Sequence, residues 1–97
     1  MTDLKQAYRI ALDNYGKADF CTEYEDVYHF IAEEDRWQFS DPGIAVRKSD
    51  GLCRFGYFDR TELIRCYRIE NGQFIEYEPE EEEWKKWDFS AEAKNTR

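Results

Sequence analysis

Two dipeptides, Asp50-Gly51 and Asn71-Gly72, each separate two short runs that are rich in β-branched and aromatic residues. Asn-Gly and Asp-Gly are both strong hairpin signals, and Asn71-Gly72 has the sequence of a type I′ turn, whose central residues need positive φ. We therefore predict one hairpin from residues 44–48 and 52–57 and another from residues 63–70 and 73–78. Hairpin connections make neighbouring strands antiparallel, which argues against a parallel α/β fold.

A third hairpin is predicted upstream, from residues 18–24 and 27–32 around the turn Glu25-Asp26. In its second run, Tyr28 and Phe30 alternate with Val27, His29 and Ile31. Both faces of this strand are therefore partly apolar, which is typical of a strand covered on two sides.

An amphipathic helix is predicted from about residue 3 to residue 15. Its apolar stripe recurs at helical spacing in Leu4, Ala7, Tyr8, Ala11 and Tyr15. Asp3 can cap the N-terminus with Gln6 as the reciprocal partner, and Gly16 is placed to end the helix in a left-handed conformation.

A second, shorter helix is predicted at residues 79–94. Pro79 suits the first turn of a helix, and the glutamates at 80–83 would lie at its positive dipole end. Trp84 and Trp87 are three residues apart, so we expect them to anchor this helix on the sheet.

With 97 residues, the chain is predicted to form a single domain, 1–97. We expect an α+β fold in which an N-terminal helix (1–17) packs on an antiparallel meander sheet of four to six strands (18–78), with a short C-terminal helix (79–94).

Charge is the feature that bears most on function. The net charge is −8, and residues 18–43 alone carry eight acids against the single base Arg36. Such a chain repels phosphate backbones, so we expect no direct nucleic-acid binding, whereas a basic protein would be attracted. The candidate partner-binding residues are Glu23, Glu25, Asp26, Glu33, Glu34, Asp35 and Trp37.

The residues that carry metal, redox or nucleophilic chemistry are few. Cys21, Cys53 and Cys66 are odd in number, and the N-terminus lacks a basic-then-apolar leader, which favours reduced thiols in a cytoplasmic protein. His29 is the only histidine. We therefore expect no metal, no cofactor and no enzymatic activity, and no apolar run is long enough for a membrane span.

The predicted arrangement resembles small bacterial immunity-protein and PepSY-like domains, in which a helix leads into a meander. The resemblance rests on the helix at 7–12, the strand at 27–30 and the stretch at 42–51, where a hydrophobic strand runs through Lys48 into Asp50-Gly51. It covers roughly residues 4–55 and implies a non-enzymatic, partner-binding role.

Charge, aromatic content and this resemblance favour a small cytosolic protein-binding module. Seventeen aromatic residues are many for one small sheet, and exposed Tyr and Trp are enriched in binding patches. An inhibitor or immunity-type protein for a basic partner is the kind we expect. The alternative is a small enzyme or ligand-binding domain whose pocket lies between helix and sheet, lined by Tyr8, Tyr28, Phe30 and Tyr57.

Overall fold

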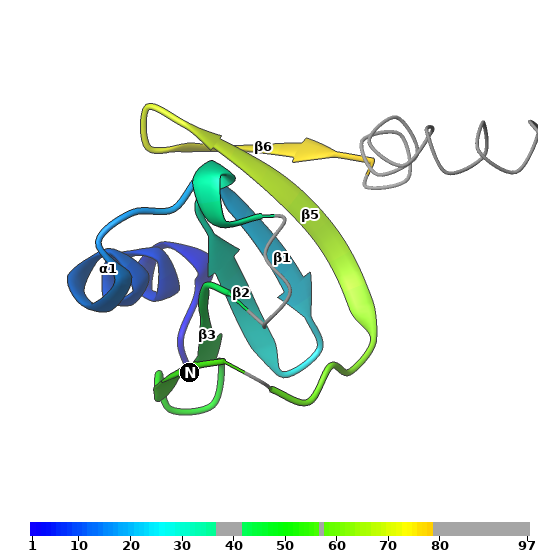
Figure 1. Ribbon diagram of the computed structural model, residues 1–97. Coiled ribbons are helices and arrows are strands. Elements are labelled where there is room, and N and C mark those ends of the chain that lie inside the picture. Colours follow the sequence, from blue (N-terminus) through cyan, green and yellow to red (C-terminus); the bar gives the residue numbers. More distant parts are fainter. Residues whose placement is uncertain (37–41, 57, 79–97) are drawn as a thin grey trace, which may run out of the picture.

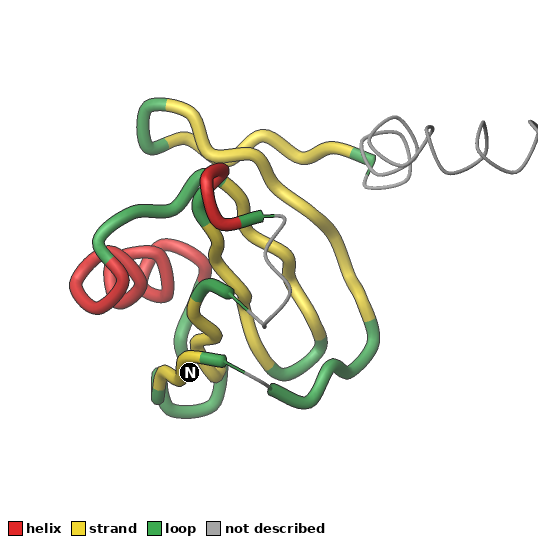
Figure 2. The backbone as a smooth tube through the Cα atoms, viewed as in Figure 1, coloured by secondary structure: helices red, strands yellow, loops and turns green. Residues whose placement is uncertain are grey.

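A computed structural model describes residues 1–36, 42–56 and 58–78. Helix α1 (Leu4–Tyr15) is followed by strands β1 (Phe20–Tyr24) and β2 (Val27–Ile31) and a 3-10 helix, η1 (Glu33–Asp35). Strands β3 (Ile44–Arg47), β4 (Cys53–Phe55), β5 (Leu63–Glu70) and β6 (Gln73–Tyr77) complete the sheet. Figures 1 and 2 show α1 lying beside one face of this sheet. The α+β class is confirmed.

The ends of α1 follow the predicted capping chemistry. The Asp3 carboxylate accepts a hydrogen bond from the Gln6 backbone N–H (2.9 Å), and the Gln6 side chain accepts one from the Asp3 backbone N–H (3.0 Å). Gly16 ends the helix with φ +93°, a conformation that costs an L-residue roughly 1–2 kcal/mol.

The six strands form one antiparallel sheet in the order β4-β3-β2-β1-β5-β6. The predicted meander holds for the first four strands and is wrong for the last two, because β5 pairs with β1 instead of β4. β4 offers only three residues for pairing, whereas all five residues of β1 find partners along β5. The longer ladder satisfies more backbone groups, and the β5–β6 hairpin therefore joins the sheet at its opposite side.

The sheet face beside α1, called the helix face here, carries the main core. α1 packs on β2 and β3 through Ala7 and Ala11, both fully buried. Beneath them lie Phe30, Ile44 and Val46, which are also fully inaccessible to solvent. Burying each of these large side chains contributes about 1.5–3 kcal/mol to folding.

The opposite face, called the outer face here, is also partly covered, as the pattern in β2 predicted. Phe58 is buried and stacks on His29, with ring centroids 4.8 Å apart. The His29 ring also forms a hydrogen bond between Nε2 and the Pro42 carbonyl (2.9 Å). His29 is thus part of the packing of this face.

The Asn71-Gly72 turn has the predicted backbone. Asn71 has φ +54° and Gly72 has φ +77°, as a type I′ turn requires at both positions. The turn joins β5 to β6 and projects above the other strands in Figure 1. The predicted C-terminal helix at 79–94, with Trp84 and Trp87, lies outside the described residues.

Candidate functional site

The predicted partner-binding acids do not form one surface. Glu25 and Asp26 lie in the β1–β2 turn, whereas Glu33, Glu34 and Asp35 form η1. The five residues of β2 separate these two groups, a span of about 17 Å at the usual strand rise. In Figure 1 the turn and η1 lie at opposite ends of the sheet. Trp37 lies outside the described residues.

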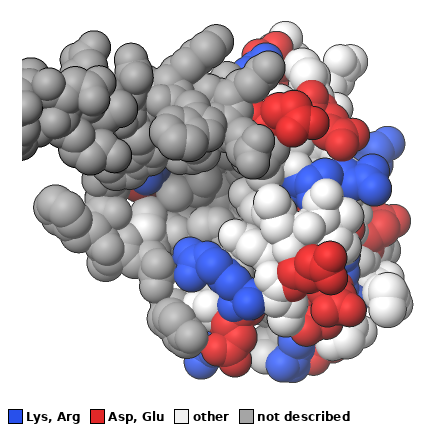
Figure 3. Space-filling model, turned by 90° about the vertical axis from the view of Figure 1, so that its right-hand side faces the viewer, with Lys and Arg blue, Asp and Glu red and all other residues white. Residues whose placement is uncertain are grey.

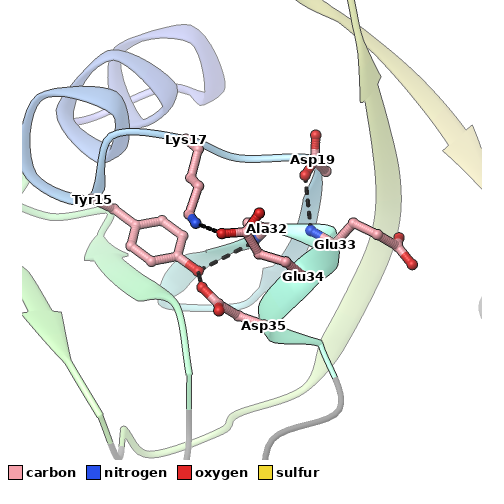
Figure 4. A network of polar contacts seen from close by, with 7 residues as sticks. All are labelled: Tyr15, Lys17, Asp19, Ala32, Glu33, Glu34 and Asp35. Atoms are coloured by element: carbon pink, nitrogen blue, oxygen red, sulfur yellow. Dashed lines mark hydrogen bonds and ion pairs between the residues drawn. The ribbon is translucent and has the colours of Figure 1, made fainter.

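The η1 acids are held by the last residue of α1 and by the segment that follows it, as Figure 4 shows. The Tyr15 hydroxyl at the end of α1 donates a hydrogen bond to the Asp35 carboxylate. The same hydroxyl accepts one from the Ala32 backbone N–H (3.3 Å). Burial of the phenol, followed by its hydrogen bond to Asp35, raises the pKa of Tyr15 to about 12. Tyr15 therefore remains a neutral donor over the physiological pH range.

Two further contacts hold the start of η1. Lys17 forms an ion pair with Glu34, and the Asp19 carboxylate accepts a hydrogen bond from the Glu33 backbone N–H (2.8 Å). These contacts join residues 15–19 to residues 32–35 (Figure 4). We call the set Asp19, Glu33, Glu34 and Asp35 the acidic corner. The geometry of the acidic corner is set by the contacts between residues 15–19 and residues 32–35. The 3-10 helix η1 has only a single turn and does not set it alone.

The acidic corner keeps a negative balance after its ion pairs are counted. Among the residues that the structure describes, its four carboxylates lie beside two cations, Lys17 and Arg36, which leaves two net negative charges. The Arg36 side chain is only 7% exposed, and its guanidinium lies 4.0 Å above the Phe20 ring. Glu33 and Glu34 remain well exposed, with side-chain exposures of 54% and 68%. These two carboxylates are therefore in contact with solvent while each also lies in an ion pair, Glu33 with Arg36 and Glu34 with Lys17.

Glu23 is placed very differently from the other predicted acids. It points to the helix face, where its carboxylate lies 2.7 Å from the Lys48 ammonium and 3.8 Å from the Arg65 guanidinium. Glu23 and Lys48 are both about 15% exposed, at 16% and 15%. Lys48 also lies 4.9 Å from the centre of the Tyr28 ring. Glu23 thus joins β1 to β5 and to the segment after β3, and its carboxylate is mostly covered by these contacts.

The other two predicted acids, in the β1–β2 turn, are exposed, and their backbone groups connect the turn to the chain before β5. The Glu25 N–H donates to the Glu62 carbonyl (2.9 Å), and the Asp26 N–H donates to the Thr61 hydroxyl (3.3 Å). Their side chains stand apart from the acidic corner at the far end of β2.

The charge on the face nearest β5 is mixed. Figure 3 shows acidic and basic side chains interspersed there, and no single-sign field covers the described part of this face. On the described part of this face, the −8 net charge of the chain therefore does not produce a continuous acidic surface.

Two titratable groups of the core, Cys21 and Tyr28, have raised pKa values and so favour their neutral forms. Burial, followed by the charge of Glu23, raises the pKa of Cys21 well above its ordinary value. The same two causes raise the pKa of Tyr28 to about 12. A raised thiol pKa disfavours the thiolate and hence nucleophilic reactivity. In the described part of the chain, no group of three or more His, Cys, Asp or Glu side chains is arranged to hold a metal ion.

The predicted pocket between helix and sheet is occupied by packed aromatic rings. Tyr8 and Tyr28 both contact Phe30, with centroid distances of 6.1 and 6.5 Å. Tyr57 lies outside the described residues. A hollow of about 470 Å³ does occur on the outer face, lined by residues that include Val27, Ala45 and Phe58.

Tyr15, Lys17 and Asp19 are site residues that sequence reasoning missed. Tyr15 fits the apolar stripe of α1, so its hydroxyl gave no separate signal. Lys17 and Asp19 flank the helix end, and only the return of the chain through β2 brings η1 to them.

Comparisons with known proteins do not add to this picture. No protein-family model, curated protein or solved structure matches the chain. The resemblance to immunity-protein and PepSY-like domains thus stays a sequence-based expectation. Within the described ranges, α1 is too short and too polar to cross a bilayer.

Proposed function

We propose that this protein is a small binding module for a basic protein partner and that the acidic corner is where the partner docks. The observation that carries the proposal is the fixed geometry of the corner. Three consecutive acids in η1 are held by Tyr15, Lys17 and Asp19, and Glu33 and Glu34 keep most of their side-chain surface in solvent. Preordered charges lose little conformational entropy on binding.

The proposed role of the corner is mainly to accelerate and orient the encounter. Exposed charges at the rim of an interface act on the association rate more than on dissociation. Their effect depends on salt, because the Debye length falls from ~30 Å at 0.01 M to ~8 Å at 0.15 M ionic strength. An inhibitor or immunity-type protein that captures a basic target in the cytoplasm is the class of module to which such a surface belongs.

The test compares two double variants that change the net charge equally. Glu33→Gln with Glu34→Gln removes two charges at the acidic corner, and Glu25→Gln with Glu62→Gln removes two exposed charges beside the β1–β2 turn. Asp35 is left intact because it bonds to Tyr15. Each protein is used to capture partners from a cell lysate over a range of salt concentrations, and captured proteins are quantified by mass spectrometry.

The proposal requires a basic protein that binds the wild type and the turn variant but is depleted with the corner variant at low salt. For that protein, the association rate should fall severalfold with the corner variant, and the difference should vanish at high salt. Equal capture by the two variants, or an association rate that is indifferent to salt, would overturn the acidic corner as a docking site.

A further inference from the structure

The two edges of the sheet differ in what they offer to another chain. β4 forms one edge and has three residues, whereas β6 forms the other and has five. Among the described residues, no strand pairs with the free side of β6. Natural edge strands are commonly blunted by proline, lysine or a bulge, and the sequence Gln73-Phe-Ile-Glu-Tyr77 contains neither residue and pairs with β5 in unbroken register.

The register of the β5–β6 hairpin identifies the backbone groups at this free edge. A two-residue turn closes with the Glu70 carbonyl accepting from the Gln73 N–H, so Glu70 and Gln73 are a hydrogen-bonded pair. Such pairs alternate along an antiparallel ladder, which makes Ile75 and Tyr77 the next residues to bond with β5. The N–H and C=O groups of Phe74 and Glu76 therefore point away from the sheet.

The side chains of β6 form two different rows. Phe74 and Glu76 lie on the helix face, where Phe74 packs edge-on against Tyr8 and Tyr67, with centroid distances of 5.2 and 5.9 Å. Ile75 and Tyr77 lie on the outer face, and Ile75 is 38% exposed. A strand added beside β6 would thus meet Phe74 and the exposed carboxylate of Glu76 on the helix face, and Ile75 and Tyr77 on the outer face.

The outer row of β6 is continuous with the acidic corner. The Tyr77 ring lies 6.3 Å from the Phe20 ring, and the same Phe20 lies beneath the Arg36 guanidinium that follows η1. Tyr77 and the end of η1 therefore share one neighbour on the outer face. A partner bound along β6 lies on the same side of the molecule as the corner.

We propose that an extended segment of the basic partner adds to β6 as a seventh strand. This inference rests on the proposed function and names the way the partner is held. The Phe74 and Glu76 backbone groups supply the ladder, Glu76 selects a basic side chain opposite it, and Ile75 and Tyr77 select apolar ones. The recognised segment therefore carries a basic residue opposite Glu76 with an apolar residue on each side of it in sequence, a pattern that an alternating basic and apolar peptide contains. Charge complementarity at Glu76 favours this occupant over a second copy of an acidic chain.

The experiment uses the full chain and a synthetic peptide in which lysine and valine alternate, with a peptide of the same composition arranged in two blocks as the control. Binding is measured by fluorescence anisotropy, and amide hydrogen exchange is followed by NMR. The alternating peptide should bind more tightly than the block peptide and should slow exchange at Phe74 and Glu76 specifically.

Two substitutions at one position separate the backbone from the charge. Glu76→Gln removes the carboxylate and should weaken binding roughly two- to fivefold, as for an exposed ion pair. Glu76→Pro also removes the outward N–H, which β5 does not use, so the fold is retained and binding should fall by about tenfold or more. Circular dichroism and exchange at β1 and β2 amides verify that both variants are folded.

Several results would overturn the strand-addition proposal. These are equal affinity for the two peptides, unchanged exchange at Phe74 and Glu76, or wild-type binding by Glu76→Pro. Slow hydrogen exchange of these two amides without any peptide would also overturn it, because the edge of β6 would then already be covered. If this protection falls on dilution, a second copy of the chain covers the edge. If it does not, a segment of the same chain covers the edge. If lysate capture still depends on the corner charges, only strand addition fails. If the peptide binds β6 but lysate capture is the same with and without the charges of the acidic corner, the proposed function fails instead.

Discussion

Replacing Tyr15 with phenylalanine removes the hydroxyl that connects α1 to η1 while leaving the ring in place. The ring contact with Phe55, 6.3 Å between centroids, should persist. The lost interactions are the hydrogen bond donated to Asp35 and the one accepted from Ala32. Hydrogen bonds to charged groups are worth about 1.5–3 kcal/mol and neutral ones about 0.5–1.5 kcal/mol. Because both partners can regain water at this half-buried position, we expect a net loss of about 1–2 kcal/mol.

Urea denaturation followed by circular dichroism measures this loss directly. With a slope of about 1–3 kcal/mol per M for a small domain, a loss of about 1–2 kcal/mol should lower the midpoint by roughly 0.3–2 M. Tyr8→Phe is the matched control, because it removes a hydroxyl from a half-buried ring of α1 that packs on Phe30 and Phe74. It should cost less than about 0.5 kcal/mol.

The pH dependence gives a second, independent signature. The pKa of Tyr15 is raised from about 10 to about 12, so the folded state favours the neutral phenol. A group with a raised pKa contributes stability that is fully present below the unfolded value and is lost as pH rises through the folded value. The stability difference between wild type and Tyr15→Phe should therefore shrink between about pH 10 and pH 12. A constant difference across this range, or equal midpoints at pH 7, would refute the role given to the hydroxyl.

Four other perturbations probe separate parts of the fold. Gly43→Ala should destabilise the protein by about 2–4 kcal/mol, because φ is +90° and the new Cβ would lie 2.3 Å from the Phe30 backbone oxygen. Gly72→Val has no such clash, but φ is +77°, so it should destabilise the protein by about 1–2 kcal/mol. Iodoacetamide should modify half-buried Cys53 first in the native protein, and modification of either buried cysteine at the same rate would contradict the packing. Lys48→Met should cost about 1–3 kcal/mol by thermal or urea unfolding, because it removes the closest cation from the mostly buried carboxylate of Glu23; an unchanged midpoint would show that this ion pair contributes nothing.

Local signals predicted the elements well, because each depends on neighbours in sequence. The capping box at Asp3 and Gln6 and the turn at Asn71-Gly72 are short-range chemistry, and both occur as expected. Such signals could not predict that β5 pairs with β1. A turn sequence specifies which two strands form a hairpin, but it does not specify which edge of the sheet that hairpin joins. That choice depends on pairs such as Glu23 with Arg65, which are brought together only by the fold.

The candidate site shows the same division. The acidic content of η1 is visible in the sequence, but its orientation depends on Tyr15 at the end of α1 and Lys17 just after it, which lie about twenty residues earlier. Conversely, the acidity of residues 18–43 suggested one surface, whereas the length of β2 places its two acidic groups at opposite ends of the sheet. Strand length could have revealed this separation before any coordinates were known.

The pairing of β5 with β1 also has a consequence for how the chain folds. The pairings among β1, β2, β3 and β4 join only strands that are consecutive in sequence, so α1 and these strands can assemble through short loop closures. The β1–β5 ladder instead joins residues such as Phe20 and Arg68, which are 48 positions apart. Closing so large a loop is entropically costly and slows the formation of such contacts. The β5–β6 hairpin should therefore form its own turn early and dock onto β1 late, so that folding is completed at the seam where Glu23 meets Arg65.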